Sequence, residues 1–285
     1  MIRLDAATVL LQWATGGLLF LWVTTRRREV GIGYGWLLRA VYAVIALGAA
    51  AAGVFVDAEP VRDLCALGVV ASATVALAVS IVRRKAGVAG ERARKARKAA
   101  RVAAMAGTTA VLDEPELEAT AKEFPPALDL VAPLIGLVGL VAAGIAAGEP
   151  HALAVARTLA GALFLGAVSD AMLLGHWYLV QPGLGRGPLL ELNRWLALTW
   201  PLEVGLLLWP TGMLSVLAGT VDDGWNGTLG WFWVACAIST LVLTAVTQAA
   251  LREKAYSAVM AATGLLYLAI LTAFGTDLVA RAVLA

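Results

Sequence analysis

Residues 130–147 read LVAPLIGLVGLVAAGIAA, a run of 18 residues without a charged side chain. An α-helix rises about 1.5 Å per residue, so roughly 20 apolar residues are enough to cross the hydrocarbon core of a bilayer. Further runs of this kind fill most of the chain. We therefore expect eight transmembrane helices, at residues 4–25, 34–56, 64–82, 127–148, 152–180, 194–218, 228–250 and 255–280.

The composition of the whole chain supports a membrane environment. Of its 285 residues, 60% are hydrophobic and only 15% are charged, and the mean hydropathy is +0.81. Soluble domains are usually about 45–50% apolar. Unpaired backbone groups are not tolerated in lipid, and the alternating segments of about 10 residues that form membrane β-barrels are absent. The sequence predicts an all-α fold, a polytopic membrane helical bundle.

One hydrophilic stretch interrupts the apolar runs. Residues 1–82 hold the first three expected helices, residues 83–126 form a basic and then acidic cytoplasmic loop, and residues 127–285 hold the other five. Within the loop, four basic residues follow the spacing of one helix face: Arg94, Arg97, Lys98 and Arg101. This face either docks a partner or anionic lipid, or it is a solvated face that only fixes the topology. Because the basic stretch lacks interleaved aromatic residues, we expect no nucleic-acid binding.

The distribution of lysine and arginine predicts the orientation. The loops after the first, third, fifth and seventh expected helices carry most of these residues, whereas the opposite side carries Arg3, Arg62 and Arg281. Cytoplasmic loops of membrane proteins are enriched in Lys and Arg. We therefore predict a multi-pass protein of a bacterial plasma (inner) membrane, with both termini on the non-cytoplasmic side.

An internal similarity appears when the chain is shifted by 152 residues. Gly31, Gly33, Gly35, Leu37 and Leu38 then fall on Gly183, Gly185, Gly187, Leu189 and Leu190. Both sets occupy a turn between the first and second helix of a group of four, which favours two parallel four-helix halves. The alternative is that glycine, of which the chain has 29, simply collects in tight turns.

Two carboxyl groups fall inside the fifth and sixth expected spans. Asp170 is in the fifth span, about 9 Å outward from His176, and Glu203 is near the middle of the sixth, so we expect the two acids to lie within about 5 Å of each other in depth. A charge at the centre of a membrane helix costs about 2.5–3.5 kcal/mol, so each acid needs a partner, a wet cavity or a proton. Pro201 cannot donate a backbone hydrogen bond and favours a bend beside Glu203. The sequence predicts a midplane pocket; the alternative is that both acids hydrogen-bond to neighbouring helices.

Further polar and aromatic residues follow on the cytoplasmic side of these acids. Histidine exchanges protons near neutral pH, arginine holds anions and aromatic rings stack on planar ligands. We predict a ligand site or proton path formed by Asp170, His176, Trp177, Tyr178, Asn193, Arg194, Thr199 and Glu203. Such a site suits the head group of a quinone. The alternative is an interfacial aromatic belt beside an arginine that reaches the headgroups.

Arg39 and Arg157 also fall inside expected spans. Arg39 is expected just inside the inner boundary, where its side chain can extend to the lipid headgroups. Arg157 is expected near the outer end of the fifth span, where Glu149 and Asp57 are candidate partners.

The chain lacks the motifs of several other functions. HExxH, GxSxG, CxxC and Walker A sequences are absent. The two histidines, His151 and His176, are ~38 Å apart along one helix, too far for one haem in a monomer. We therefore expect no covalent or metal cofactor, and a quinone or lipid is the candidate ligand. The sequence leaves open whether the chain is an enzyme.

Three functional interpretations follow. In the first, the chain is an integral membrane subunit or anchor that binds a quinone-like ligand between its fifth and sixth helices, within a larger respiratory-type complex that performs electron transport. Its partners are then membrane lipids and other protein subunits. In the second, the chain is a proton-coupled secondary transporter that uses Asp170 and Glu203. In the third, it is an accessory scaffold without chemistry of its own.

Overall fold

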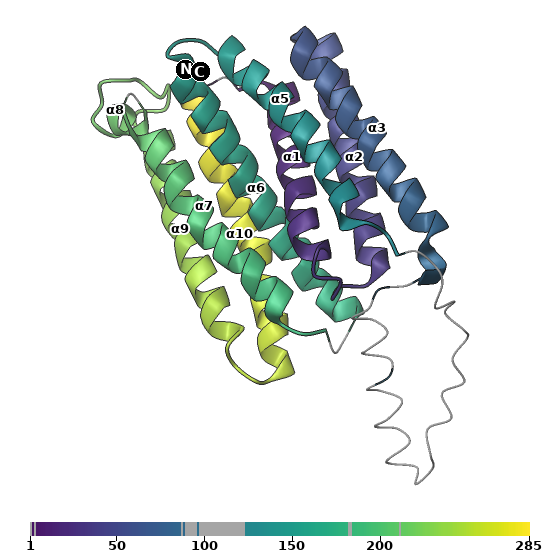
Figure 1. Cartoon of the computed structure of the whole chain (residues 1–285). Helices are drawn as coiled ribbons and strands as arrows, with labels where there is room; N and C mark the ends of the chain where they lie inside the picture. The colour runs from purple at the N-terminus through teal and green to yellow at the C-terminus, as the bar shows by residue number, and fades with distance from the viewer. Residues whose placement is uncertain are drawn as a thin grey trace.

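The computed structural model describes residues 2, 4–86, 88, 96, 123–181, 184–210 and 212–285. Within these ranges the chain is helical and forms no strand. Its elements are α1 (Ala6–Thr25), α2 (Ile32–Phe55), α3 (Pro60–Val82), η1 (Arg84–Ala86), η2 (Pro126–Leu130), α5 (Val131–Ala146), α6 (His151–Val180), α7 (Gly187–Leu208), α8 (Met213–Leu217), α9 (Thr228–Ala250) and α10 (Tyr256–Val283). Figure 1 shows these helices arranged as one bundle.

The predicted helical membrane bundle is confirmed. In the described part of the chain, seven helical segments are long and apolar enough to cross a membrane: α1, α2, α3, η2 with α5, α6, α9 and α10. α7 is as long as several of these, with 22 residues, but Glu191, Arg194 and Glu203 lie along it. The chain is a multi-pass helical membrane protein.

The expected span at residues 194–218 is wrong in its limits. α7 begins at Gly187 and ends at Leu208, and residues 213–217 form the separate short helix α8. The first residues of α7 include polar side chains that bind partners on other segments. The helix can therefore begin before these residues rather than after them. At its end, Trp209 precedes Pro210 and is extended, as expected for a residue before proline. The other seven helices begin and end within four residues of the expected limits.

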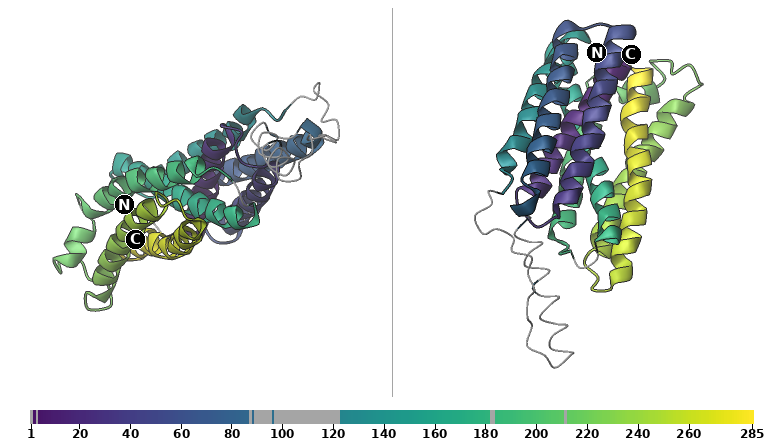
Figure 2. Two further views of the ribbon diagram at one scale, coloured as in Figure 1. Left: turned by 90° about the horizontal axis from the view of Figure 1, so that it is seen from below. Right: turned by 90° about the vertical axis from the view of Figure 1, so that its right-hand side faces the viewer.

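Two helices form the centre of the bundle. In the most apolar part of α1, 72% of the residues are buried, and the figure for α6 is 67%, against at most 44% for the other candidate spans. α1 packs against α2, α5 and α6, and α6 packs against α5, α7 and α10. Viewed along the helices, the bundle is elongated, with α3 towards one edge and α9 towards the other (Figure 2).

Small residues allow α1 and α6 to approach closely. A β-carbon on Gly16 of α1 would collide with the backbone of Ala162, and one on Gly166 of α6 would collide with the backbone of Gly16. Contacts between small residues are a common way for membrane helices to pack without a hydrophobic driving force. The crossing fixes the two central helices against each other and so positions the polar residues that they carry.

The two ends of the bundle differ in character. Both termini lie at one end together with α8, which we call the termini end (Figures 1 and 2). At the opposite end, which we call the basic end, Glu191 of α7 pairs with Arg26 at 2.6 Å and with Arg27 at 2.9 Å. Arg186 donates hydrogen bonds there to the carbonyls of Lys254 and Ala255. These contacts tie the turns of the basic end together.

Arg39 is buried, which corrects the expectation that it reaches the headgroups. Its Nε and Nη2 atoms donate to the two carboxylate oxygens of Asp129 at 2.7 Å each, and the ring of Phe124 lies 4.3 Å from its guanidinium carbon. Thr25 donates to the same carboxylate. The pair joins α2 to η2. Arg39 binds Asp129 rather than the headgroups because a bidentate partner close in space is a better ligand than distant headgroups. Arg94, Arg97, Lys98 and Arg101, whose helix face was predicted, lie outside the described residues.

Candidate functional site

Four ionisable side chains meet inside the bundle towards the termini end. They are Arg157 of α6, Glu203 of α7, and Asp277 and Arg281 of α10, which we call the charged cluster. Each residue is at most 1% exposed. Because charges in a membrane interior are costly unless they are paired or wet, the members of this cluster must stabilise one another.

The arginines connect the three helices of the charged cluster. Arg281 donates from Nε to Oδ2 of Asp277 at 2.8 Å, one helical turn away. Arg157 donates from Nε to the carbonyl of Leu206 at 2.8 Å and so joins α6 to α7. Both arginines interact electrostatically with Glu203. Two acids and two bases therefore lie close together.

A glycine on α6 makes room for the cluster. A β-carbon on Gly161 would lie 2.5 Å from Nε2 of Gln12 and 2.8 Å from Oδ1 of Asp277. Gln12 is fully buried on α1 and donates to the carbonyl of Thr158 at 2.6 Å. Side chains of α1 and α10 thus converge on the surface of α6 at a position that has no side chain.

A second carboxyl group, that of Asp277, lies beside Glu203. The carboxyl groups of Glu203 and Asp277 lie close enough to interact with each other. No N–H or O–H group of the described residues donates to either carboxyl oxygen of Glu203. Two carboxylates this close repel each other, and one proton held between them removes the repulsion. We call Glu203 and Asp277 the acid pair.

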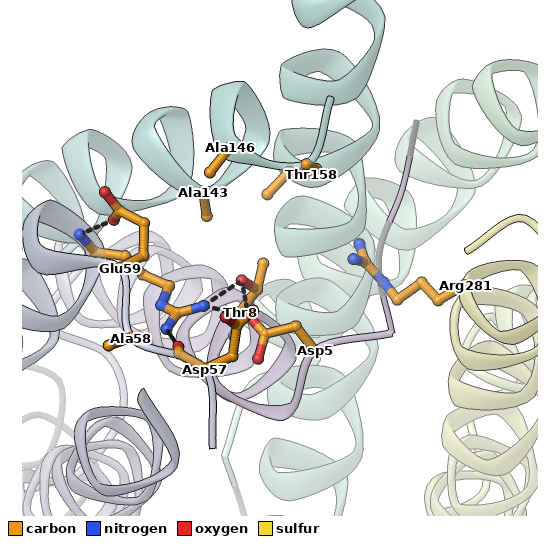
Figure 3. A pocket seen from close by; sticks show the side chains of 11 residues that line it. Asp5, Thr8, Asp57, Ala58, Glu59, Ala143, Ala146, Thr158 and Arg281 are labelled. Carbon is orange, nitrogen blue, oxygen red and sulfur yellow. Dashed lines mark hydrogen bonds and ion pairs between the residues drawn. The ribbon is translucent and has the colours of Figure 1, made fainter. Parts of the chain in front are cut away.

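A polar cavity lies between the charged cluster and the termini end. Its volume is about 80 Å³, and its lining includes Asp5, Arg62, Thr158 and Arg281. Figure 3 shows Arg281 reaching from α10 towards the side of the cavity that carries Thr158. A cavity of this size and polarity can hold water. We call this cavity the vestibule; Arg281, which lines it, also donates a hydrogen bond to Asp277 of the acid pair.

Arg62 frames the vestibule. It is only 3% exposed, and its guanidinium forms ion pairs with Asp5 and with Asp63, the latter at 2.8 Å. It also donates to the carbonyl of Asp57. The start of α1, the start of α3 and the loop before α3 are therefore fixed around one side chain, as the close-up of the cavity shows for Asp5 and Asp57 (Figure 3).

Asp170 forms a second buried acidic site with different neighbours. It is fully buried on α6, and its Oδ1 atom accepts a hydrogen bond from the hydroxyl of Tyr42 on α2. The hydroxyl of Tyr34 donates to the backbone carbonyl of Asp170 at 3.4 Å. The adjacent Ser169 accepts from the indole of Trp13 on α1 at 2.8 Å. Asp170 is therefore held by tyrosines rather than by bases.

Asp170 and Glu203, which were expected to share one pocket, have different neighbours in the structure. Glu203 lies beside Arg157, and 13 residues of α6 separate Arg157 from Asp170, a rise of about 20 Å. The expected depths of the two acids were counted from assumed membrane boundaries on two different helices. α7 begins at Gly187, earlier than expected, so Glu203 lies further along its helix from the basic end.

The structure does not bring the other predicted residues together with the two acids. His176 is exposed and faces the hydroxyl of Tyr267 at 3.1 Å, and Arg194 is also exposed. The remaining four make local hydrogen bonds: Trp177 to Gln181, Tyr178 to the carbonyl of Gly185, Asn193 to Thr244 and Gln248, and Thr199 to carbonyls within its own helix. None of these six lines the vestibule. Of the predicted residues, Glu203 belongs to the charged cluster and Asp170 to the second site.

Sequence reasoning missed Asp277, Arg281 and Gln12 as site residues. Arg281 was assigned to an outer loop, and Asp277 was not considered. The available signal was an acid and a base four residues apart at the end of an apolar run, a spacing that places both side chains on one helix face. For Arg157 we expected Glu149 or Asp57 as partner; the structure places Glu203 beside it, and Glu149 pairs with His151 at 2.8 Å.

An apolar hollow lies elsewhere in the bundle. It has a volume of about 220 Å³ and lies between α1, α5 and α6, with Thr15 among mainly aliphatic residues such as Leu134, Leu137 and Leu163. Leu134 and Leu137 are among the exposed hydrophobic residues. In a membrane this hollow faces acyl chains rather than water.

Comparison of the chain with family models, with characterised proteins and with solved structures gives no match. Across the part of the chain that is described, no group of three or more His, Cys, Asp or Glu side chains could hold a metal ion. The chemistry of the acid pair and its surroundings is therefore the basis for a functional assignment.

Proposed function

We propose that the chain is a proton-coupled membrane protein of the secondary-transporter class, in which the acid pair is the proton-binding centre. The observation that carries this proposal is the meeting of Glu203 and Asp277, from two different helices, in a fully buried place. Acidic residues inside membrane bundles are rare and typically mark ion pathways and proton relays. Because the two acids belong to α7 and α10, a proton between them also couples those helices.

The charged neighbours make the proton exchangeable. With Arg157 and Arg281 both protonated, two ionised acids balance two bases, and one added proton leaves one positive charge. Neither state leaves an acid without a base nearby, so the free-energy difference between them stays moderate. A centre with two accessible protonation states is what a proton-coupled transporter needs.

The vestibule supplies access from the termini end. It adjoins Arg281, which contacts Asp277, and its polar lining can hold water. We propose that a proton reaches the acid pair from this side, through water in the vestibule and past Arg281.

The quinone-binding interpretation stays a prediction. The vestibule and the apolar hollow are lined by none of the residues Trp177, Tyr178, Asn193 and Arg194. The apolar hollow favours a lipid-soluble ligand between α1, α5 and α6, whereas the sequence predicted one between the fifth and sixth helices. Membership of a respiratory-type complex, other subunits as partners and the scaffold interpretation likewise stay predictions.

We also propose the finer topology. α7 is the eighth span, since it runs beside α6 and packs against both α6 and α9. Two halves of four helices are supported by matching neighbours: α1 contacts α2 and α5, as α6 contacts α7 and α10. The arginine-rich turns at the basic end favour a plasma (inner) membrane with that end in the cytoplasm and both termini outside.

Proton flux tests the proposed function. The full chain is reconstituted in proteoliposomes that contain a pH-sensitive dye, and a potassium gradient with valinomycin drives proton entry. We expect flux above that of protein-free liposomes, and a decrease of at least about tenfold in Glu203→Gln and in Asp277→Asn. Glu191→Gln is the matched control, because it removes an acid from the same helix outside the cluster. Equal flux in the wild type and in Glu203→Gln contradicts the proposal.

A further inference from the structure

Asp170 lies in a setting that differs from that of the acid pair in one respect. In the described residues no lysine or arginine forms an ion pair with it. Its Oδ1 atom has the hydroxyl of Tyr42 as a donor, and its Oδ2 atom has no hydrogen-bond partner among the described residues. An ionised carboxylate without a counter-ion is costly at this depth, so we expect Asp170 to carry a proton at rest.

The position of Asp170 places it between the acid pair and the basic end. It is about 20 Å along α6 from Arg157, and its ten-residue separation from Val180, where α6 ends, corresponds to about 15 Å. On α1, adjacent residues serve the two sites: Gln12 contacts the wall of the charged cluster, and Trp13 contacts Ser169 next to Asp170. The two acidic sites are thus joined by both central helices.

The neighbours of Asp170 lead towards the basic end. Tyr34 is the third residue of α2 and therefore lies near the end of that helix at the basic face, where its ring contacts the ring of Trp177 at 6.0 Å between centroids. Tyr42 is two turns further along the same helix. A tyrosine hydroxyl both donates and accepts hydrogen bonds, so it can pass on a proton without changing charge overall.

We propose that Asp170 is a second proton-binding site, which exchanges its proton with water at the basic end past Tyr42 and Tyr34. This inference rests on the proposed function. On release, the O–H bond at Asp170 breaks, its proton passes to water, and the carboxylate that remains is held by the hydroxyl of Tyr42. The next proton comes from the acid pair, carried by water that enters between the two sites, and the acid pair returns to its two-carboxylate state. The titratable groups that face Asp170 are Tyr34 and Tyr42 of α2, while α1 presents Trp13.

A glycine on α1 offers a variant that removes no titratable group. The ring of Tyr42 passes over Gly17, and a β-carbon at that position would collide with the ring. Gly17→Ala therefore displaces Tyr42 from Asp170 while both side chains remain. Gly264→Ala on α10 is the matched control, since a β-carbon there meets nothing within 4 Å.

Infrared spectroscopy and flux together test the inference. The full chain in lipid nanodiscs is transferred from H₂O to D₂O, and the carbonyl band of protonated carboxyl groups is followed. We expect one such band to be missing in Asp170→Asn, to exchange with D₂O in the wild type, and to shift in Tyr42→Phe and Gly17→Ala. Proton flux should fall at least about tenfold in Asp170→Asn and by a smaller factor in Tyr42→Phe and Gly17→Ala.

A purely structural role gives a different result. If Asp170 only ties α6 to α2, its carboxyl band does not exchange, or flux in a folded Asp170→Asn protein equals that of the wild type; either outcome overturns the inference. If Asp170→Asn does not fold, unchanged flux in Tyr42→Phe and Gly17→Ala overturns it. Loss of flux in Glu203→Gln with full flux in Asp170→Asn leaves the proposed function standing, whereas unchanged flux in Glu203→Gln contradicts that function itself.

Discussion

Asp277 lies against Gly161: its Oδ1 atom is 2.8 Å from the place where a β-carbon on Gly161 would be. Real side chains do not approach so closely, so any larger residue at this position must push Asp277 or Gln12 aside. The same glycine therefore sets the distance between α6 and the acid pair. Its replacement tests the geometry of the cluster without changing a charge.

Gly161→Ala is expected to destabilise the protein by about 1–3 kcal/mol, as overpacking of a filled interior does. We also expect proton flux to decrease, because Asp277 moves relative to Glu203. Thermal unfolding in detergent and flux in proteoliposomes measure the two effects. Gly264→Ala, which has open space for its methyl group, should change neither; a Gly161→Ala protein that behaves like this control contradicts the packing described here.

Removing one partner of the Arg39–Asp129 pair should be costly. Both residues are at most 3% exposed, so Arg39→Met leaves Asp129 charged and unpaired inside the bundle, at a cost of about 3–5 kcal/mol. The double variant Arg39→Met with Asp129→Leu should recover most of this loss, because neither charge remains. Unfolding free energies of the two single variants and the double variant test this in one cycle. If the losses of unfolding free energy in the two single variants add up in the double variant, Arg39 and Asp129 do not pair directly.

The pKa of Asp223 predicts that the folded protein becomes less stable in acid. Burial raises the pKa of its carboxyl group, but backbone N–H groups of Gly227, Trp225, Gly230 and Leu229 outweigh this effect and hold the pKa below its ordinary value of 3.8. A group with a lowered pKa in the folded state stabilises that state above the pKa of the unfolded chain. The contribution is complete at neutral pH and is lost as the pH falls below 3.8.

Asp223→Asn should therefore melt at a lower temperature than the wild type at pH 7, and the two melting temperatures should converge in acid. The physical reason is that the charged carboxyl group of Asp223 stabilises the start of α9. Both of its oxygens accept backbone hydrogen bonds there, from Gly227 at 2.8 Å and from Leu229 at 2.9 Å among others. Asp222→Asn is the neighbouring control, since its carboxyl accepts from Gly224 in the loop. A difference in melting temperature that is the same at every pH would show that the charge of Asp223 is not involved.

The topology can be tested with single cysteines. In a chain with Cys65 and Cys236 replaced by alanine, Asp222→Cys should react with a membrane-impermeant maleimide added to intact cells. Glu253→Cys should react only after the membrane is opened, because it lies in a turn of the basic end. The reverse pattern would place both termini in the cytoplasm.

The sequence was sufficient to predict where most helices lie, because an apolar run of membrane length has few alternatives. It failed at the start of α7, where Glu191 and Asn193 interrupt the apolar pattern and are balanced by Arg26, Arg27 and Gln248 from distant parts of the chain. Such partners are a tertiary property and leave no local signal.

For the site, the rarity of acidic residues inside apolar runs was a useful signal. The sequence did not show which residues lie next to one another. Glu203 and Asp170 were found because acids are uncommon inside apolar runs. The pairing of Glu203 with Asp277 could not be predicted. The order of helices along the chain does not show that α10 lies against α6 and brings Asp277 to Glu203. The depth of each residue was also uncertain as long as the start of α7 was unknown.

The most direct test of the acid pair is the infrared difference spectrum between the wild type and Glu203→Gln, recorded in lipid nanodiscs across a pH titration. If one proton is shared between Glu203 and Asp277, the spectrum contains a protonated-carboxyl band that titrates, and Asp277→Asn removes the same band. A spectrum in which both carboxyl groups stay ionised at every pH, or in which Asp277→Asn leaves the band unchanged, contradicts a shared proton.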